Sequence, residues 1–132
     1  MGLKLRTCPF CNQLPEIKQV KFGVENLTVV EGEAPDALKD LPDCDVAIIG
    51  GSGSRLYEIL DEISARFKAG GRVVINCITI QTLAAALDYL RGHSDAFSYE
   101  AIQVQINRLQ AVGAYDMAKA INPIYIVTGE KK

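Results

Sequence analysis

The sequence is short of the residues that build metal centres and membrane spans. It has one histidine, His93, and no tryptophan, and the Cys-x-x-Cys pair of Cys8 and Cys11 has no second copy. A four-ligand zinc site therefore cannot be completed from its motifs. No apolar run reaches the roughly 18 residues that a membrane span requires, and the first residues lack the apolar centre of a secretory signal. We expect a cytoplasmic protein with no metal site and no membrane contact.

An excess of basic residues is also lacking. The 14 lysines and arginines are outnumbered by 16 aspartates and glutamates, which gives a net charge of −2. A nucleic-acid-binding protein usually carries a basic patch and a high isoelectric point, so this charge balance argues against a nucleic-acid partner. With 132 residues, of which 48% are hydrophobic, the chain fits a single soluble globular domain.

From residue 27 onward, short β-branched runs alternate with amphipathic stretches. Apolar residues recur at helical spacing between residues 55 and 68, and the runs at 45–49 and 72–77 are apolar on both faces, as in the centre of a parallel sheet. The predicted elements are a strand at 27–30, a short helix at 35–41, a strand at 45–49, a helix at 55–68 closed by Gly70, a strand at 72–77 and a helix from Thr79 or Thr82 to Gly92.

The C-terminal part changes character. We predict a long strand at 97–107, a loop with one helical turn at 108–120 and a final strand at 124–127. Two strands joined without a long helix favour an antiparallel pair. Alternating β and α units followed by such a pair predict the α/β class, as a three-layer sandwich with a mostly parallel sheet and a C-terminal antiparallel hairpin. Residues 3–6 are a candidate short strand.

Several segments resemble the decarboxylating precorrin methyltransferases of cobalamin biosynthesis, which belong to the class I S-adenosylmethionine-dependent methyltransferases. The resemblance is carried by the Glu-Gly-Glu-Ala-Pro turn at 31–35, the Ile-Gly-Gly-Ser-Gly strand end at 49–53, the Gly-Gly before the strand at 72–77 and the Asn-Pro at 122–123. It implies a Rossmann-like fold over residues 21–129. Residues 1–20 would then be an atypical segment of the same single domain, 1–132.

The resemblance also implies an activity and its partners. Family members methylate a precorrin at the precorrin-6B stage and remove the carboxylate of one acetate side chain, with S-adenosylmethionine as cofactor and a small tetrapyrrole as substrate. They associate as tetramers, so a homo-oligomer is expected, with contacts through 97–107 and 124–127. The sulfonium supplies the electrophile in this chemistry, and the protein mainly positions and desolvates the reactants.

The N-terminus departs from the family pattern. Class I methyltransferases begin with a strand and a glycine-rich turn that hold the methionine part of the cofactor, and no Gly-x-Gly pattern precedes residue 50 here. The family's first-half motifs therefore have no position in this chain, which resembles an N-terminally truncated domain. Without those strands, residues 27–30 must pair elsewhere, either beside 46–49 or with 3–6 between them.

Gly50, Gly51, Ser52 and Gly53 follow a predicted strand, at the end where open α/β sheets bind ligands. Glycines let a ligand approach the backbone closely, and the next helix offers free N–H groups to an anion. The resemblance implies that this loop lies between cofactor and substrate. We assign Gly50 and Gly51 to the cofactor and Ser52 and Gly53 to the substrate. A tight turn with Ser54 as helix N-cap is the alternative.

Two further pairs of residues are candidates. Glu33 and Ala34 follow the strand at 27–30, and the resemblance implies that this turn lies beside the adenine of the cofactor. A polar turn with no ligand is the alternative. Arg108 and Tyr115 are candidates for gripping the carboxylates of the substrate, because arginine binds carboxylates with two parallel hydrogen bonds. Solvated surface residues are the alternative here.

Cys8 and Cys11 support a different hypothesis. A Cys-x-x-Cys pair after a short strand is typical of a thiol-redox site, and an incidental pair is the alternative. Cys44 and Cys77 are expected to be small buried apolar residues, and His93 is expected to cap a helix end. Besides the enzyme, the sequence thus leaves open a methyltransferase-fold interaction module without catalysis and a thiol-redox protein.

Overall fold

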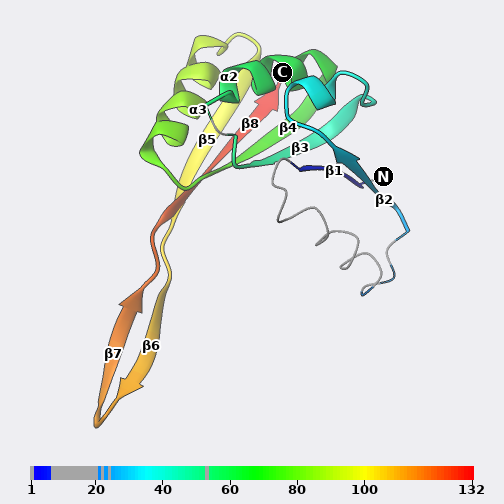
Figure 1. Cartoon of the computed structure of the whole chain (residues 1–132). Coiled ribbons are helices and arrows are strands. Elements are labelled where there is room, and N and C mark those ends of the chain that lie inside the picture. Colours follow the sequence, from blue (N-terminus) through cyan, green and yellow to red (C-terminus); the bar gives the residue numbers. More distant parts are fainter. Residues whose placement is uncertain (1, 7–20, 22, 24, 53) are drawn as a thin grey trace.

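The structure is a computed structural model that describes residues 2–6, 21, 23, 25–52 and 54–132 (Figure 1). No helix among these residues is long and apolar enough to cross a membrane. The elements, in chain order, are β1 (Gly2–Arg6), β2 (Leu27–Glu31), the short 3₁₀ helix η2 (Asp36–Leu38), β3 (Cys44–Gly50), α2 (Leu56–Arg66), β4 (Phe67–Cys77), α3 (Ile80–Gly92), β5 (Phe97–Val104), β6 (Asn107–Val112), β7 (Tyr115–Ala120) and β8 (Ile124–Lys131).

A four-stranded mixed sheet forms the centre of the molecule, in the order β3-β4-β8-β5. β3 and β4 run parallel, as the α2 crossover between them requires, whereas β8 runs antiparallel to both β4 and β5. The α/β class is therefore confirmed, together with the antiparallel pair at the C-terminal end. The last strand is longer than predicted, because β8 pairs as far as Lys131.

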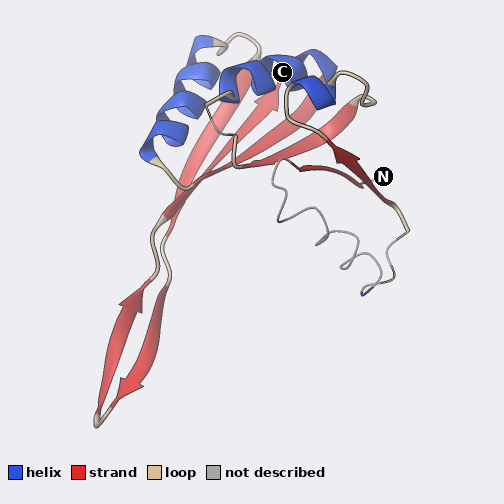
Figure 2. Ribbon diagram, in the orientation of Figure 1, coloured by secondary structure: helices blue, strands red, loops and turns tan. Residues whose placement is uncertain are grey.

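Both long helices, α2 and α3, cover the same face of this sheet (Figure 2). The core lies between them and the sheet, where Ile75, Val73 and Val127 are almost completely buried beneath Leu90 of α3. The side chain of Tyr89 joins the two helices, since its hydroxyl donates a hydrogen bond of 2.9 Å to the Asp61 carboxylate.

The opposite face of the sheet is open at β3. The prediction that the run at 45–49 is buried on both faces is wrong, because Val46 is 52% and Ile48 78% exposed, while Ile49 is buried under the helices. The physical reason is position: β3 is the edge of the four-stranded sheet, and the helices described lie on the other side. The prediction holds better for β4, in which Val73 and Ile75 are fully buried and Val74 half-buried.

β1 and β2 form a separate parallel pair, in register from Gly2 opposite Leu27 to Arg6 opposite Glu31. The strands expected at 3–6 and 27–30 are thus both present. Of the two pairings considered for 27–30, the one beside β3 is not formed. β1 is its partner instead, and among the residues described β1 makes no ladder with β3.

Residues 107–120 form a two-stranded arm that projects away from the sheet (Figure 1). The prediction of a loop with one helical turn is wrong here, and the strand predicted at 97–107 ends at Val104. β6 and β7 pair antiparallel, with Val112 opposite Tyr115. The turn between them begins at Gly113, whose φ of +63° is the left-handed conformation that a two-residue hairpin turn needs at its first position. This Gly-Ala turn was the missed signal.

Three local predictions also need correction. The helix expected at 35–41 is only the 3₁₀ turn at Asp36–Leu38. α2 ends at Arg66 with an extended residue after it, so Gly70, with φ +83°, lies inside β4 rather than closing the helix. The N-cap of α2 is Arg55 and not Ser54. By contrast, α3 begins as predicted, because the Thr79 hydroxyl accepts a 3.1 Å hydrogen bond from the backbone N–H of Thr82.

Candidate functional site

The candidate site lies at the carboxyl edge of the parallel strands. β3 ends at Gly50 and β4 at Cys77, and Gly50 stands opposite Asn76 in the parallel ladder. The loop after β3 and the residues after β4 therefore leave the sheet side by side. Open α/β sheets bind ligands outside this edge.

The loop after β3 leaves its backbone accessible. A Cβ built on Gly50 or Gly51 would meet no atom within 4 Å, and Gly51 has φ +82°, which side-chain-bearing residues rarely adopt. The carbonyl of Ser52 accepts a 3.2 Å hydrogen bond from the backbone N–H of Arg55, and this bond leads the loop into α2. A ligand could thus approach the backbone at Gly50 and Gly51 directly. Gly53 lies outside the residues described.

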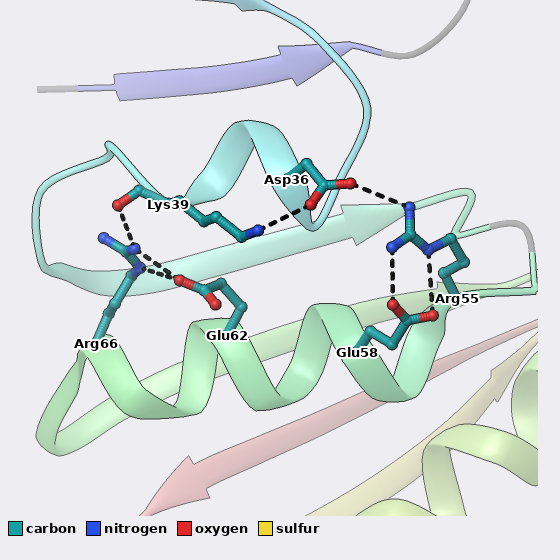
Figure 3. A network of polar contacts seen from close by, with 6 residues as sticks. All are labelled: Asp36, Lys39, Arg55, Glu58, Glu62 and Arg66. Atoms are coloured by element: carbon teal, nitrogen blue, oxygen red, sulfur yellow. Dashed lines mark hydrogen bonds and ion pairs between the residues drawn. The ribbon is translucent and has the colours of Figure 1, made fainter.

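An ion pair joins the segment after β2 to the start of α2, which follows the glycine loop. Asp36 follows the Glu33–Ala34 turn, and its Oδ2 lies 3.5 Å from Nη1 of Arg55 at the start of α2 (Figure 3). Glu33 is exposed, and its carbonyl accepts a 2.9 Å hydrogen bond from the N–H of Ala37. Ala34 packs against the core. The ion pair therefore links the segment that follows the Glu33–Ala34 turn to the start of the helix that follows the glycine loop.

A second set of contacts fixes the other end of the 36–41 segment. Arg66 donates hydrogen bonds to the carbonyls of Leu41 and Lys39 and pairs with Glu62 at 2.7 Å (Figure 3). Residues 36–41 are thus held to both ends of α2. Because α2 also follows the glycine loop, one helix positions both segments of the candidate site.

The charged groups of this network shift one another's pKa values. The hydrogen bond and positive charge of Lys39 lower the pKa of Asp36 below its ordinary value of 3.8, and Arg55 adds to the effect. Arg55 also binds both carboxylate oxygens of Glu58, at 3.1 and 2.7 Å, and this hydrogen bonding lowers the pKa of Glu58. These carboxylates are therefore ionised and paired at neutral pH, which leaves them no role as proton donors.

Three residues at this edge were missed by the sequence reasoning. Asn76, beside Gly50, has a buried side-chain oxygen that finds no hydrogen-bond partner in the described part of the chain. Ile78 and Ile80, just after β4, are 67% and 66% exposed and present an apolar surface. The amide was visible in the sequence as a single polar residue inside the apolar run at 72–77. Buried polar groups without a partner are uncommon and require an explanation.

Arg108 and Tyr115, predicted to bind substrate, lie elsewhere. Both are on the arm, where Arg108 stands opposite Lys119, and Tyr115 is 78% exposed close to the turn. The arm strands contact each other, and Figure 1 shows them projecting from the sheet. The structure of one chain therefore does not bring these two residues to the glycine loop.

The remaining candidates have structural roles where they are described. Cys77 is fully buried and Cys44 half-buried, as expected, and burial raises the pKa of both thiols. His93 caps α3, since its backbone N–H donates to the carbonyl of Tyr89 at 3.1 Å and its ring Nδ1 lies 2.8 Å from the same oxygen. Cys8 and Cys11 lie outside the described residues. Within the part of the chain described, no cluster of His, Cys, Asp and Glu could hold a metal ion.

Comparison with solved structures defines the class of this fold. The chain superimposes on precorrin-6y C5,15-methyltransferase from Geobacter metallireducens with a TM-score of 0.88 and 36% identity, covering 98% of this chain and 67% of that chain. A tRNA (m1A58) methyltransferase from Aquifex aeolicus matches with a TM-score of 0.74 at 13% identity, which shows the fold alone. The fold is that of the class I methyltransferases.

Sequence comparison defines the family. The model of the precorrin methyltransferase domain matches residues 13–131, and the chain therefore belongs to that family. A probable cobalt-precorrin-6B C(15)-methyltransferase (decarboxylating) from Methanothermobacter thermautotrophicus is 36% identical over 103 residues, which are 78% of this chain and 53% of that protein. A protein of the same description from Pyrobaculum aerophilum is 33% identical, over 61% of its length. The chain thus spans little more than half the length of these relatives.

Proposed function

We propose that this chain takes part in S-adenosylmethionine-dependent methyl transfer to a precorrin at the precorrin-6B stage, coupled to loss of a carboxylate, in the cytoplasm. The observation that carries the proposal is the open backbone of Gly50 and Gly51 at the carboxyl edge of the sheet, in a member of the precorrin methyltransferase family. The Methanothermobacter relative is named a probable decarboxylating cobalt-precorrin-6B C(15)-methyltransferase, and the Geobacter protein a precorrin-6y C5,15-methyltransferase.

The residues present fit one side of the proposed cofactor. Gly50 and Gly51 leave the space that a Cβ would otherwise fill, and the exposed carboxylate of Glu33 is free to accept N–H or O–H donors of the adenosine part. Ala34 closes the turn against the core. When bound, the cofactor supplies a methyl group on a positively charged sulfur. The role of these residues is to bind and orient it.

The proposed substrate, a tetrapyrrole, is flat and apolar on its faces and carries carboxylates at its rim. Ile78 and Ile80 offer an exposed apolar surface for the ring beside the glycine loop. The hydroxyl of Ser52 would border the substrate side of the loop. Asn76 has an amide oxygen suited to accept an N–H of the ring, which would satisfy an atom that has no partner among the residues described. These residues hold the ring and exclude water, which favours methyl transfer.

We further propose that Arg108 and Tyr115 serve the site of a neighbouring copy in a homo-oligomer, which the family resemblance suggests is a tetramer. Leu109, Tyr115 and Met117 of the arm are each more than half exposed. A two-stranded ribbon is only marginally stable by itself in water, so association of arms from several copies would stabilise it. The arm leaves the sheet at the carboxyl edge, next to the candidate site.

Chemical-shift mapping with S-adenosylhomocysteine tests the assignment residue by residue. We expect amide shifts of the ¹⁵N-labelled chain to change at Glu33, Ala34, Gly50 and Gly51 and to stay constant along the arm. Changes scattered over the surface, or none in a folded sample, would contradict the proposal. A methyltransferase-fold module without catalysis would give the second result.

A further inference from the structure

Arg108 and Lys119 stand directly opposite each other on the arm. The Cβ atoms of directly opposed strand residues lie about 5 Å apart, and two charges of the same sign in such a pair destabilise it. Both side chains are exposed, and no ion pair joins either of them to a carboxylate of the residues described. The arm thus holds two cations side by side, at a cost to its own stability.

The acidic residue of the arm does not neutralise these cations. Asp116 is the single aspartate or glutamate in the sequence of residues 107–120, and it stands opposite Ala111. Because side chains alternate between the two faces of a strand, Asp116 lies on the face opposite to that of Arg108 and Lys119. The positive charge of their face is therefore left for a partner that the arm does not supply.

The two faces of the arm differ in character. Beyond Gln110, the face of Arg108 and Lys119 continues toward the turn with apolar side chains that are 49%, 56% and 78% exposed, namely those of Val112, Met117 and Tyr115. The other face consists of Leu109 and of small or polar residues, namely Asn107, Ala111, Asp116, Ala118 and Ala120. Of the two, the first alone combines cations with a run of large apolar side chains, and we name it the cationic face.

A tetrapyrrole of the precorrin type has the complementary chemistry. Its ring is flat and apolar, and acetate and propionate carboxylates surround its rim. Arginine binds a carboxylate through two parallel hydrogen bonds, and lysine contributes a compact positive charge beside it. Adjacent carboxylates of the rim therefore match the adjacent cations, and the apolar ring matches the side chains that lie toward the turn.

We propose that Lys119 binds the rim carboxylates of the tetrapyrrole together with Arg108, so that the cationic face selects rings that carry many carboxylates. Arg108 was a candidate for this role from the sequence, and the pairing in register adds Lys119 to it. Val112 and Met117 then join Tyr115 in contacting the ring. The inference rests on the proposed function, because it describes how the substrate of that reaction is held.

Titration of the full 132-residue chain with uroporphyrin tests the proposal, with the fluorescence of the porphyrin as signal. Uroporphyrin is a tetrapyrrole with an acetate and a propionate on each pyrrole ring. Binding should be saturable. Lys119→Gln and Arg108→Gln should each weaken it about tenfold, because a charge-assisted hydrogen bond to a carboxylate is lost. Lys119→Arg should keep the affinity, since a guanidinium also binds carboxylates.

Lys68→Gln is the matched control. Lys68 is likewise an exposed lysine in a strand, and it lies near the start of β4, outside the arm. Its replacement changes the net charge equally and should leave the affinity for uroporphyrin unchanged. Coproporphyrin, which has methyl groups in place of the acetates, gives a second comparison. The wild-type chain should prefer uroporphyrin to coproporphyrin, and this preference should shrink in Lys119→Gln.

Melting temperatures and analytical ultracentrifugation establish that the variants keep their fold and their assembly. The proposal is overturned if the folded wild-type chain does not bind uroporphyrin, or if Lys119→Gln and Lys68→Gln bind it with equal affinity. It is also overturned if Lys119→Gln weakens binding only by lowering the mass of the assembly, since Lys119 would then act between copies.

A parallel titration with S-adenosylhomocysteine separates this inference from the proposed function. Uroporphyrin requires no cofactor in order to bind. A chain that binds uroporphyrin through Lys119 but does not bind S-adenosylhomocysteine would contradict the proposed methyl transfer and support the cationic face. A chain that binds S-adenosylhomocysteine, but whose affinity for uroporphyrin does not depend on Lys119, would support the proposed function and overturn the present inference.

Discussion

Arg55 lies 3.5 Å from Asp36, and this ion pair joins the turn after β2 to the helix after β3. The two residues are 19 positions apart in the sequence, and they follow the Glu33–Ala34 turn and the glycine loop, which were predicted to contact the cofactor. Arg55 also forms an ion pair with Glu58. The Asp36–Arg55 pair thus links two segments that flank the predicted cofactor residues.

Replacing Arg55 should reduce cofactor affinity more than it reduces the stability of the fold. In Arg55→Met, we expect affinity for S-adenosylhomocysteine to fall severalfold, because the Glu33 turn loses its link to the glycine loop. Thermal stability should change little, since exposed ion pairs contribute little to folding. The control is Arg72→Met, which breaks the exposed Arg72–Glu130 pair on the same sheet. If Arg55→Met and Arg72→Met bind S-adenosylhomocysteine with equal affinity, the Asp36–Arg55 ion pair has no part in positioning the site.

Acid should weaken this network in a defined range of pH. The pKa values of Asp36 and Glu58 lie below their ordinary 3.8 and 4.5 in the folded protein. Their contribution to stability is therefore complete above those ordinary values and is lost as pH falls through the lower folded values. Because exposed ion pairs contribute little to stability, melting temperatures measured from neutral pH down to about pH 2 should show only a slightly shallower acid decline in the double variant Asp36→Asn, Glu58→Gln. Identical acid limbs in the two proteins would refute the shifts.

Replacement by alanine should lower the stability of the protein at one glycine and leave it nearly unchanged at another. A Cβ on Gly129 would lie 2.8 Å from Cδ2 of Leu90 and 3.2 Å from Cγ1 of Val73. Gly129→Ala should therefore lower the free energy of unfolding by about 1–3 kcal/mol through overpacking. Gly50→Ala meets open space and should leave stability nearly unchanged. Urea unfolding of both variants measures this, and equal destabilisation would mean that the loop at Gly50 is packed after all.

The arm should govern association without governing folding. Its strands are exposed throughout and contribute no residue to the buried core. The double variant Leu109→Lys, Met117→Lys should therefore shift the chain from an oligomer to a monomer in analytical ultracentrifugation, with an unchanged melting temperature of the α/β part. An unchanged mass would contradict the assignment of the arm as the contact between copies.

The parts of the fold that were predicted correctly are those where local pattern and burial agree. The spacing of Leu56, Ile59, Leu60 and Ile63 specifies a helix with one buried side, and all four are buried in α2. Thr79 specifies the start of α3 by accepting from Thr82. The glycine loop could be placed because an apolar strand that ends in glycines leaves few other options.

The other predictions failed where the local structure depends on neighbours that are distant in the sequence. The run at 45–49 has the composition of a central strand, yet its exposure depends on which strands and helices lie beside it. The arm was missed because its exposed apolar residues fit no core-facing pattern, and only Gly113 marks the turn. The Asp36–Arg55 pair and the unpartnered oxygen of Asn76 depend on tertiary contacts that no spacing in the sequence specifies.

The central claim is that the glycine loop binds S-adenosylmethionine, and calorimetric titration with S-adenosylhomocysteine tests it most directly. The wild-type chain should bind saturably, with a Kd below about 1 mM. Gly50→Ala, which leaves the fold unstrained, should bind at least about tenfold more weakly, because its methyl group occupies the space left for the ligand. No heat from the folded wild-type chain, or equal affinity in the two proteins, would contradict the account.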